Sequence, residues 1–330
     1  MCMKRKSGYF QRIAFPLLLW AFFLPLVLSA QQNNRDSVEV SFPVAGGSIQ
    51  GTLFKPLRVK HPAVVLIIAG SGPTDRNGNS RILPGKNNSL LQLADSLAAH
   101  GIASLRYDKR GIAKSQLSGF KEENMRFSDG VDDAIAWIKW LRENGFKKIY
   151  IAGHSEGSLV GMSAASQEKL NGFISIAGSG RRIDLVLKEQ LNDREGPDSI
   201  KQLAGHYLDT LLAGQRIAKP NPLLFSLFRP SVQPYMISWL QYDPATIIAS
   251  LRCPVLLVQG TSDMQIKESD AKLLHAAHPG SQLVLIENMN HVFKEVSSDN
   301  PLDNFKAYSD PSLPVMEALV KAIVRFVKAK

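Results

Sequence analysis

The chain has 330 residues, of which 45% are hydrophobic and 21% are charged, and this composition belongs to a protein that buries a core rather than to a disordered chain. The 24 glycines and 18 prolines are close to average usage, which excludes collagen-like and low-complexity classes. Two cysteines cannot make a disulfide-rich scaffold, so packing must hold the fold together. The formal net charge is +10.

The first thirty residues have the layout of a secretory signal peptide. Four basic residues and no acid precede an apolar run over residues 13–28, and the small residues Ser29 and Ala30 come before a polar stretch. Cleavage after Ala30 leaves 39 − 4 = 35 bases against 29 acids, a net charge of +6. A retained transmembrane anchor is the alternative, although the run is shorter than the ~20 residues that a span needs.

We therefore expect residues 1–30 to be a signal peptide and residues 31–328 to be the folded domain, exported to the periplasm or to the medium. Cys2 lies in the basic region, so Cys253 is the cysteine that the mature chain keeps. One thiol cannot form an internal disulfide, which suits an exported protein that does without them.

The domain opens with a predicted hairpin and continues as strands alternating with helices. Apolar and polar residues alternate over 38–42, and after the Gly46-Gly47 turn a second alternating run leads to Phe54. Short apolar runs then predict buried strands at residues 63–69, 102–105, 148–152, 173–177, 254–258 and 283–286. Helical patterns predict helices at residues 89–100, 129–143, 159–167, 266–278 and 314–327. This order predicts an α/β fold whose parallel sheet is covered by helices on both faces.

About 70 residues separate the strand at 173–177 from the strand at 254–258, and this interval interrupts the regular alternation of strands and helices. Within this interval the apolar positions from Ile200 to Leu212 have the spacing of an amphipathic helix. We therefore expect a helical insertion between these two strands.

The pentapeptide Gly153-His154-Ser155-Glu156-Gly157 carries the strongest chemical signal. It directly follows an apolar strand and directly precedes a helical pattern, and its glycines suit a sharp strand-to-helix turn that exposes the serine hydroxyl. An ordinary glycine-rich turn is the alternative. In this context the pattern predicts Ser155 as a catalytic nucleophile.

A serine nucleophile needs a base to take its proton and an acid to orient the base, and in this topology the acid comes first along the chain. The strand at 254–258 leads into Asp263, and the strand at 283–286 leads into His291. We predict these two residues as the acid and the base. Asp270 also competes for the role of the acid, but it falls inside a predicted helix, where we expect a solvated side chain.

Acyl transfer also requires donors for the developing oxyanion. We assign one donor to the backbone N–H of Glu156, directly after the nucleophile. The other should come from the glycine-rich turn after the first parallel strand, where we choose Ser71, with Gly72 as its competitor and a candidate substrate contact.

Together these features resemble an α/β-hydrolase, and more narrowly the carboxylesterases grouped with the serine-aminopeptidase-like branch. The features are the pentapeptide, the triad order, the turn at residues 70–73 and the Tyr-Asp-Lys-Arg-Gly segment at 107–111. The resemblance covers about residues 38–328, and Ala69 departs from it, since many relatives carry a histidine there. It implies an eight-stranded, mostly parallel sheet, a Ser-His-Asp triad, no cofactor, and a helical cap between strands six and seven at about residues 182–248.

Other kinds of site have weaker support. Asp75 begins a segment like a calcium loop, but Lys86 occupies the position of the bidentate glutamate. His275 and His278 lack an HExxH pattern, so we expect no metal. The basic residues are spread along the chain without an aromatic and basic patch, so we expect no nucleic-acid partner.

The predicted function is hydrolysis of small carboxylic esters with short acyl chains. An aminopeptidase or amidase with the same triad, and a catalytically silent fold that binds a ligand, are the alternatives. An aminopeptidase must pair the ammonium group of its substrate with acids in or near the insertion. The acids available there are Asp184, Glu189, Asp193, Glu195, Asp198 and Asp209.

Two further hypotheses concern the surroundings of the nucleophile. Asp75 and Arg110 follow adjacent strands, so we suggest that they pair and brace Ser71, the alternative being two unrelated surface charges. Residues 223–228 are the most apolar stretch outside the strands, and Phe225 or Phe228 could wall the acyl pocket or pack inside the cap.

Overall fold

The computed structural model describes residue 1 and residues 35–82, 84–193, 195–297 and 300–329. The chain divides into a unit over Met1–Asn33 and a unit over Asn34–Lys330, and the fold below is that of the second. Apart from Met1, the predicted signal peptide and its cleavage site at Ala30 lie outside the described residues. Within these ranges, none of the helices has the length and apolar character of a membrane span.

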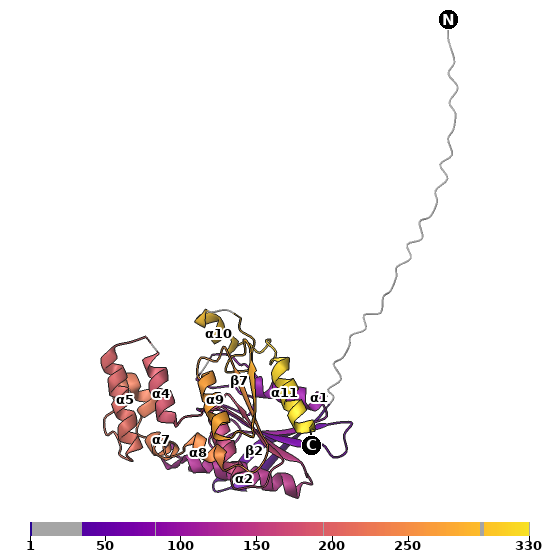
Figure 1. Cartoon of the computed structure of the whole chain (residues 1–330), viewed down its shortest axis with the longest axis horizontal. Helices are drawn as coiled ribbons and strands as arrows, with labels where there is room; N and C mark the ends of the chain where they lie inside the picture. Colours follow the sequence, from indigo (N-terminus) through magenta and orange to yellow (C-terminus); the bar gives the residue numbers. More distant parts are fainter. Residues whose placement is uncertain (2–34, 83, 194, 298–299, 330) are drawn as a thin grey trace. The chain divides into compact units, whose positions relative to one another are not determined.

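Eight strands form one sheet in the order β1-β2-β4-β3-β5-β6-β7-β8 (Figure 1). The strands are β1 (Arg35–Val44), β2 (Gly47–Pro56), β3 (Val64–Ile68), β4 (Ala103–Tyr107), β5 (Ile149–His154), β6 (Gly172–Ile176), β7 (Val255–Gly260) and β8 (Gln282–Ile286). The β1–β2 hairpin pairs antiparallel and joins β4 antiparallel, whereas every pair from β4 to β8 is parallel. The predicted fold class, including the opening hairpin, is confirmed.

Helices cover both faces of this sheet, because the strand residues are apolar on both sides. In β3, Val64 and Leu66 belong to one buried cluster together with residues of α2 and α3, whereas Val65 and Ile67 belong to a second cluster with residues of α1 and α11. The helices around the sheet are α1 (Ser89–Ala99), η1 (Glu122–Asn124), α2 (Phe127–Glu143), α3 (Glu156–Ala165), α9 (Glu268–Ala277), α10 (Pro301–Ala307) and α11 (Glu317–Lys328). The sequence pattern did not predict α10.

The predicted helical insertion lies between β6 and β7 and forms a cap. Its elements are α4 (Ile183–Asn192), α5 (Asp198–Leu212), η2 (Pro222–Leu224), α6 (Phe225–Phe228), α7 (Gln233–Trp239) and α8 (Pro244–Ala249). The amphipathic pattern over 200–212 corresponds to α5, whose buried residues are Ala204, Leu208 and Leu211. Figure 1 shows α4 and α5 side by side, away from the sheet.

Glu122 of η1 clamps the cap to the body of the domain. Its carboxylate accepts hydrogen bonds from Arg229 Nε at 2.9 Å, from Arg229 Nη2 and from Ser231 Oγ at 2.5 Å. The hydrogen bond with Arg229 is the largest cause of the lowered pKa of Glu122. Burial has the next largest effect and acts to raise this pKa, and the hydrogen bond with Ser231 acts to lower it. The clamp therefore depends on a charged carboxylate.

This lowered pKa predicts an acid-dependent contribution to stability. A carboxylate with a depressed pKa stabilises the fold fully above its unfolded-state value of about 4.3, and the contribution disappears as the pH falls through the lower folded-state value. We expect Glu122→Gln to be less stable than the wild type at pH 6, and the difference to shrink towards pH 3 in urea unfolding experiments. Glu123→Gln, at the exposed neighbour, should show no such trend. A Glu122→Gln difference that is independent of pH would contradict the clamp.

Candidate active site

Ser155 occupies the sharp turn between β5 and α3. Its backbone angles, φ 54° and ψ −121°, lie where non-glycine residues are rarely found. The flanking glycines make this turn possible, since a Cβ on Gly153 would lie 2.1 Å from the Gly157 carbonyl oxygen and a Cβ on Gly157 would lie 2.4 Å from that of Ile68. The Ser155 N–H donates to the Ile176 carbonyl at 2.9 Å. The turn is therefore held from both neighbouring strands.

The predicted acid and base lie in direct contact. His291 Nδ1 and Asp263 Oδ2 are 2.8 Å apart, and both side chains are buried. Asp263 also accepts bonds from Gln259 Nε2 at 3.1 Å and from the N–H groups of Gln265 and Ile266 at 2.8 and 3.0 Å. Burial acts to raise the pKa of Asp263, but the charge and hydrogen bond of His291 and these backbone donors outweigh it and lower the pKa. The carboxylate is therefore charged and orients the imidazole.

His154 joins the loop of His291 to the turn of Ser155. Its Nε2 donates to the His291 carbonyl at 2.9 Å. The centre of the His154 ring lies 4.7 Å from that of the His291 ring and 4.8 Å from that of the Phe293 ring. Burial, with a smaller effect of His291, lowers the pKa of His154 to about 3. The ring is therefore neutral and packs between His291 and Phe293. Among the described residues no hydrogen bond joins Ser155 Oγ to His291, and free enzymes often form this contact fully only with substrate.

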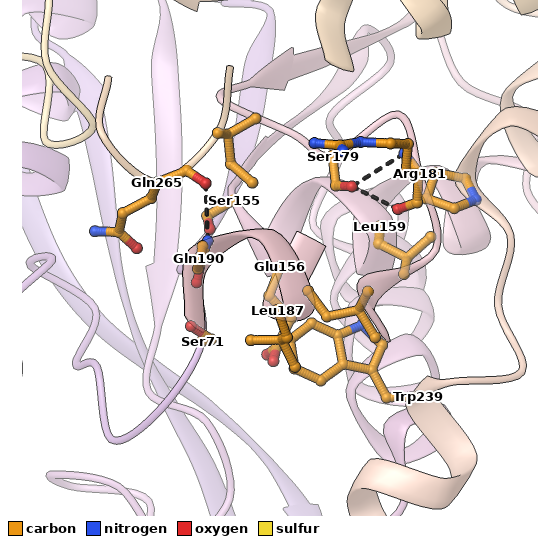
Figure 2. Close-up of a pocket in the computed structure, with 13 residues that line it drawn as sticks. Ser71, Ser155, Glu156, Leu159, Ser179, Arg181, Leu187, Gln190, Trp239 and Gln265 are labelled. Carbon is orange, nitrogen blue, oxygen red and sulfur yellow. Dashed lines mark hydrogen bonds between the residues drawn. The ribbon is translucent and has the colours of Figure 1, made fainter. Parts of the chain in front are cut away.

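A pocket opens in front of Ser155 and includes both predicted oxyanion positions, Ser71 and Glu156 (Figure 2). Its volume is about 70 Å³. The remaining lining residues are Leu159, Ser179, Arg181, Ile183, Leu187, Gln190, Trp239, Pro244, Gln265 and Ile266. Gly72 is not among them. Asp263 and His291 are not among the lining residues, but Asp263 accepts hydrogen bonds from the N–H groups of Gln265 and Ile266, which are.

Lys109 and Tyr235 support the oxyanion side, and the sequence analysis missed both. Lys109, in the loop after β4, donates to the Gly70 carbonyl at 2.6 Å and lies 3.8 Å from Glu156 Oε1. Tyr235 of the cap faces the same carboxylate, and burial followed by the charge of Glu156 raises its pKa well above the ordinary value. The Tyr-Asp-Lys-Arg-Gly segment contained the available signal, because it follows a strand beside the glycine-rich turn.

The hypothesis that Phe225 or Phe228 walls the pocket is wrong. Phe228 is fully buried inside the cap, where its ring lies 5.2 Å from that of Tyr207, and Phe225 is 50% exposed. The apolar wall from the cap comes instead from α4 and α7, through Ile183, Leu187 and Trp239.

The suggested ion pair between Asp75 and Arg110 is also wrong. Arg110 makes a bidentate pair with Asp133 of α2, at 2.9 and 2.8 Å. Asp75 accepts the N–H groups of Asn77 and Asn79 at 2.8 and 2.9 Å and so closes its own loop. The pairing that braces this loop is between Arg76 and Asp108, with Arg76 Nη2 2.8 Å from Asp108 Oδ2.

Asp270 differs from the expected solvated residue, because it is fully buried. It forms a bidentate pair with Arg181, with Nε–Oδ1 and Nη2–Oδ2 distances of 3.0 and 2.7 Å. His275 contacts Ser281 Oγ at 2.8 Å and His278 contacts a backbone carbonyl at 3.4 Å. In the described part of the chain no group of three or more His, Cys, Asp or Glu could hold a metal ion.

Comparisons with known proteins agree with this architecture. A sequence family described as serine aminopeptidase, S33, matches residues 86–220. Esterase EstD of Thermotoga maritima is 27% identical over 249 residues, which are 70% of this chain and 54% of that protein, so the chain spans about half of its length. A proline iminopeptidase of Saccharolobus solfataricus is 24% identical over 260 residues, 68% of this chain and 81% of that protein. The structure of the Pyrococcus furiosus esterase Pf2001 has a TM-score of 0.56 at 15% identity, covering 91% of this chain and 93% of that one, and shares the fold.

The position of Lys109 predicts a defect in serine reactivity when it is removed. Lys109→Met loses the bond to the Gly70 carbonyl and the charge beside Glu156, so the amides of Ser71 and Glu156 are held less firmly. We expect the rate constant for labelling of Ser155 by a fluorophosphonate to fall about tenfold or more. The measurement is made at saturating and at low reagent, which separates reactivity from binding. Lys114→Met, at an exposed lysine of the same loop that pairs with Glu39, serves as the control. Equal labelling rates in Lys109→Met and the wild type would contradict the role of Lys109.

Proposed function

We propose that this chain, which has the α/β-hydrolase fold, is a serine carboxylesterase that cleaves small esters through an acyl-enzyme. The observation that carries the proposal is the buried His291–Asp263 pair, 2.8 Å apart, joined through His154 to the turn that holds Ser155. An acid, a base and an exposed serine hydroxyl at one edge of the sheet are the groups that acyl transfer requires.

In the proposed reaction, His291 Nε2 takes the proton from Ser155 Oγ as Oγ attacks the ester carbonyl carbon. Negative charge develops on the carbonyl oxygen, which accepts hydrogen bonds from the N–H groups of Ser71 and Glu156. The protonated His291 then gives its proton to the departing alkoxide, and the acyl group remains on Oγ. Water attacks this acyl-enzyme with His291 again as base, which releases the acid and restores the serine. Asp263 keeps the proton on Nδ1 throughout.

Ion pairing of the cap acids supports esterase over aminopeptidase activity. An aminopeptidase must offer unpaired carboxylates to the ammonium of its substrate, and the sequence placed six candidates in or near the cap. Four of them already face cations, in the pairs Asp184–Arg182, Glu189–Arg181, Asp193–Lys267 and Asp209–Lys188. Glu195 and Asp198 are exposed and do not line the pocket. The peptidase alternative keeps the support of the S33 match and of the iminopeptidase relative.

The pocket also supports short acyl chains. The cavity in front of Ser155 is small, with a volume of about 70 Å³. The side chains of Leu187 and Trp239 close its cap side, so a longer chain would have to displace them.

The triad is tested by removing its members one at a time. We expect Ser155→Ala and His291→Ala each to lower kcat for p-nitrophenyl butyrate by about 10³-fold or more, and Asp263→Asn to lower it somewhat less, because the oxyanion donors and binding survive. His275→Gln, at a histidine bound to Ser281 away from the pocket, should retain its activity. Full activity in Ser155→Ala would end the proposal.

A parallel assay on an aminoacyl p-nitroanilide separates the two activities. Ester hydrolysis without anilide hydrolysis supports the esterase, whereas cleavage of the anilide at a comparable kcat/KM would favour the peptidase.

Leu187 predicts how the chain-length preference can be changed. Leu187→Ala opens the cap side of the pocket, and each extra methylene group that it admits is worth about 0.8 kcal/mol, or roughly fourfold in kcat/KM. We expect the optimum in a series of p-nitrophenyl esters to move to longer chains by one to three carbons. Leu185→Ala, at a residue of the same helix that is 46% exposed and does not line the pocket, is the matched control. If both variants keep the wild-type optimum, α4 does not limit the acyl chain.

A further inference from the structure

Arg181 lines the pocket of Ser155. It lies in the segment between β6 and α4, beside Ser179 and on the side of the pocket away from Ser71 (Figure 2). Of the thirteen lining residues, only Arg181 and Glu156 are charged, and the Glu156 carboxylate faces Lys109 and Tyr235. The other lining residues are uncharged, and Ile183 and Leu187 among them are apolar. Closing an apolar pocket does not require a charged side chain, so the presence of Arg181 in this wall needs another explanation.

Two acids hold one edge of this guanidinium in place. Asp270 binds Nε and Nη2 in the bidentate pair described above, and Glu189 Oε2 accepts from Nη2 at 2.5 Å. Asp270 Oδ1 also accepts the Gly180 N–H at 3.0 Å, which fixes the segment that carries Arg181. Lys267 Nζ binds the second oxygen of Glu189 at 2.6 Å. The arginine is therefore positioned before any substrate arrives.

The opposite edge of the guanidinium is unused. Nη1 carries two N–H donors, and within the described ranges it has no hydrogen-bond partner, although it is not sealed from solvent. An apolar acyl chain that filled the pocket would strip water from these donors without replacing it, at a cost in affinity. An acyl chain with an oxygen acceptor at this position would satisfy them.

The charges around Arg181 decide which acceptor fits. The positive charges of Arg181 and Lys267 are balanced by the negative charges of Asp270 and Glu189, and Asp193 adds a further negative charge 3.2 Å from Lys267. The cluster thus offers directed donors without a net positive field, so it gives an anionic group no long-range attraction. An uncharged carbonyl oxygen needs only the donors.

We propose that Arg181 Nη1 is a subsite for an uncharged acceptor oxygen on a short acyl chain, so that the preferred substrates are esters of oxo- or similarly oxygenated acids. This inference rests on the proposed esterase function and names the class of acyl group that the same site selects. Arg181 is the specificity-determining residue, and Asp270 and Glu189 position it.

Three p-nitrophenyl esters of nearly equal shape test the subsite. The 4-oxopentanoate ester has a ketone oxygen where the 4-methylpentanoate ester has a methyl group, and the hemisuccinate ester has a carboxylate there. For the wild type we expect kcat/KM to be highest for the oxo ester, after correction for spontaneous hydrolysis. In Arg181→Met/Asp270→Asn, which removes the donors without leaving a buried charge unpaired, the ratio of oxo to methyl ester should fall about tenfold.

The matched control is Arg182→Met/Asp184→Asn. It removes a neighbouring bidentate pair, with distances of 2.7 and 3.1 Å, that does not line the pocket, so the ratio should stay at its wild-type value. An equal ratio in the wild type and in Arg181→Met/Asp270→Asn overturns the subsite. A wild-type preference for the hemisuccinate over the oxo ester overturns the assignment to an uncharged acceptor.

A binding experiment distinguishes failure of the subsite from failure of the proposed function. It also tests the subsite if Arg181→Met/Asp270→Asn does not fold. In Ser155→Ala, the fluorescence of Trp239, which lines the pocket, reports binding of the intact methyl esters of the same three acids. Tighter binding of methyl 4-oxopentanoate than of methyl 4-methylpentanoate supports the subsite even if the wild type hydrolyses no ester. Equal binding of the two overturns it even if the wild type is an efficient esterase.

Discussion

The close approach of three backbone segments at Ser155 is the constraint on which the site depends. The turn after β5 passes so near to the end of β3 that a Cβ on Gly157 would collide with the Ile68 carbonyl oxygen. The turn is also so tight that a Cβ on Gly153 would collide with the Gly157 carbonyl oxygen. A Cβ on Gly70 would likewise lie 3.2 Å from the Ser155 Cβ. The nucleophile and the turn carrying Ser71 therefore lie in direct contact, and the Lys109 side chain holds the same turn through the Gly70 carbonyl.

The loops after β7 and β8 are joined by hydrogen bonds as well as by apolar packing. The Ser262 N–H donates to the Met289 carbonyl at 3.1 Å, and the Asn288 N–H donates to Thr261 Oγ1 at 2.9 Å. A Cβ on Gly260 would lie 2.0 Å from the Met289 carbonyl oxygen, so the two loops touch through their backbones at the strand ends. The Asn290 side chain accepts the N–H groups of Val292 and Lys294 at 3.1 and 2.9 Å and closes the turn around His291. With its loop fixed in this way, the imidazole has one orientation towards Asp263, which a general base requires.

The sequence predicted the fold and the order of the catalytic groups because both depend on local patterns. Apolar runs mark strands buried on both faces, and the pentapeptide around Ser155 needs only its own two glycines. Prediction failed where the partner of a side chain is distant in the sequence. Arg110 and Asp133 are 23 positions apart, and Arg181 and Asp270 are 89 positions apart, so no local pattern reveals either pair. The apolar stretch with Phe228 was equally ambiguous, because burial in the cap and burial in a pocket wall require the same composition.

The groups that carry out the reaction and the groups that select the substrate come from different parts of the chain. Ser155 and the two loops behind it belong to the body of the domain, whereas the pocket wall comes from the cap and from the segment that leads into it. Besides the Glu122 clamp, the two parts meet at two buried acids: Glu156 lies between Lys109 of the body and Tyr235 of the cap, and Asp270 of α9 binds Arg181. Because these contacts are polar and directional, the cap is seated in a defined position over the nucleophile. The side chains of the cap that line the pocket can then vary without disturbing the backbone contacts at Ser155. One catalytic body can therefore serve different acyl groups.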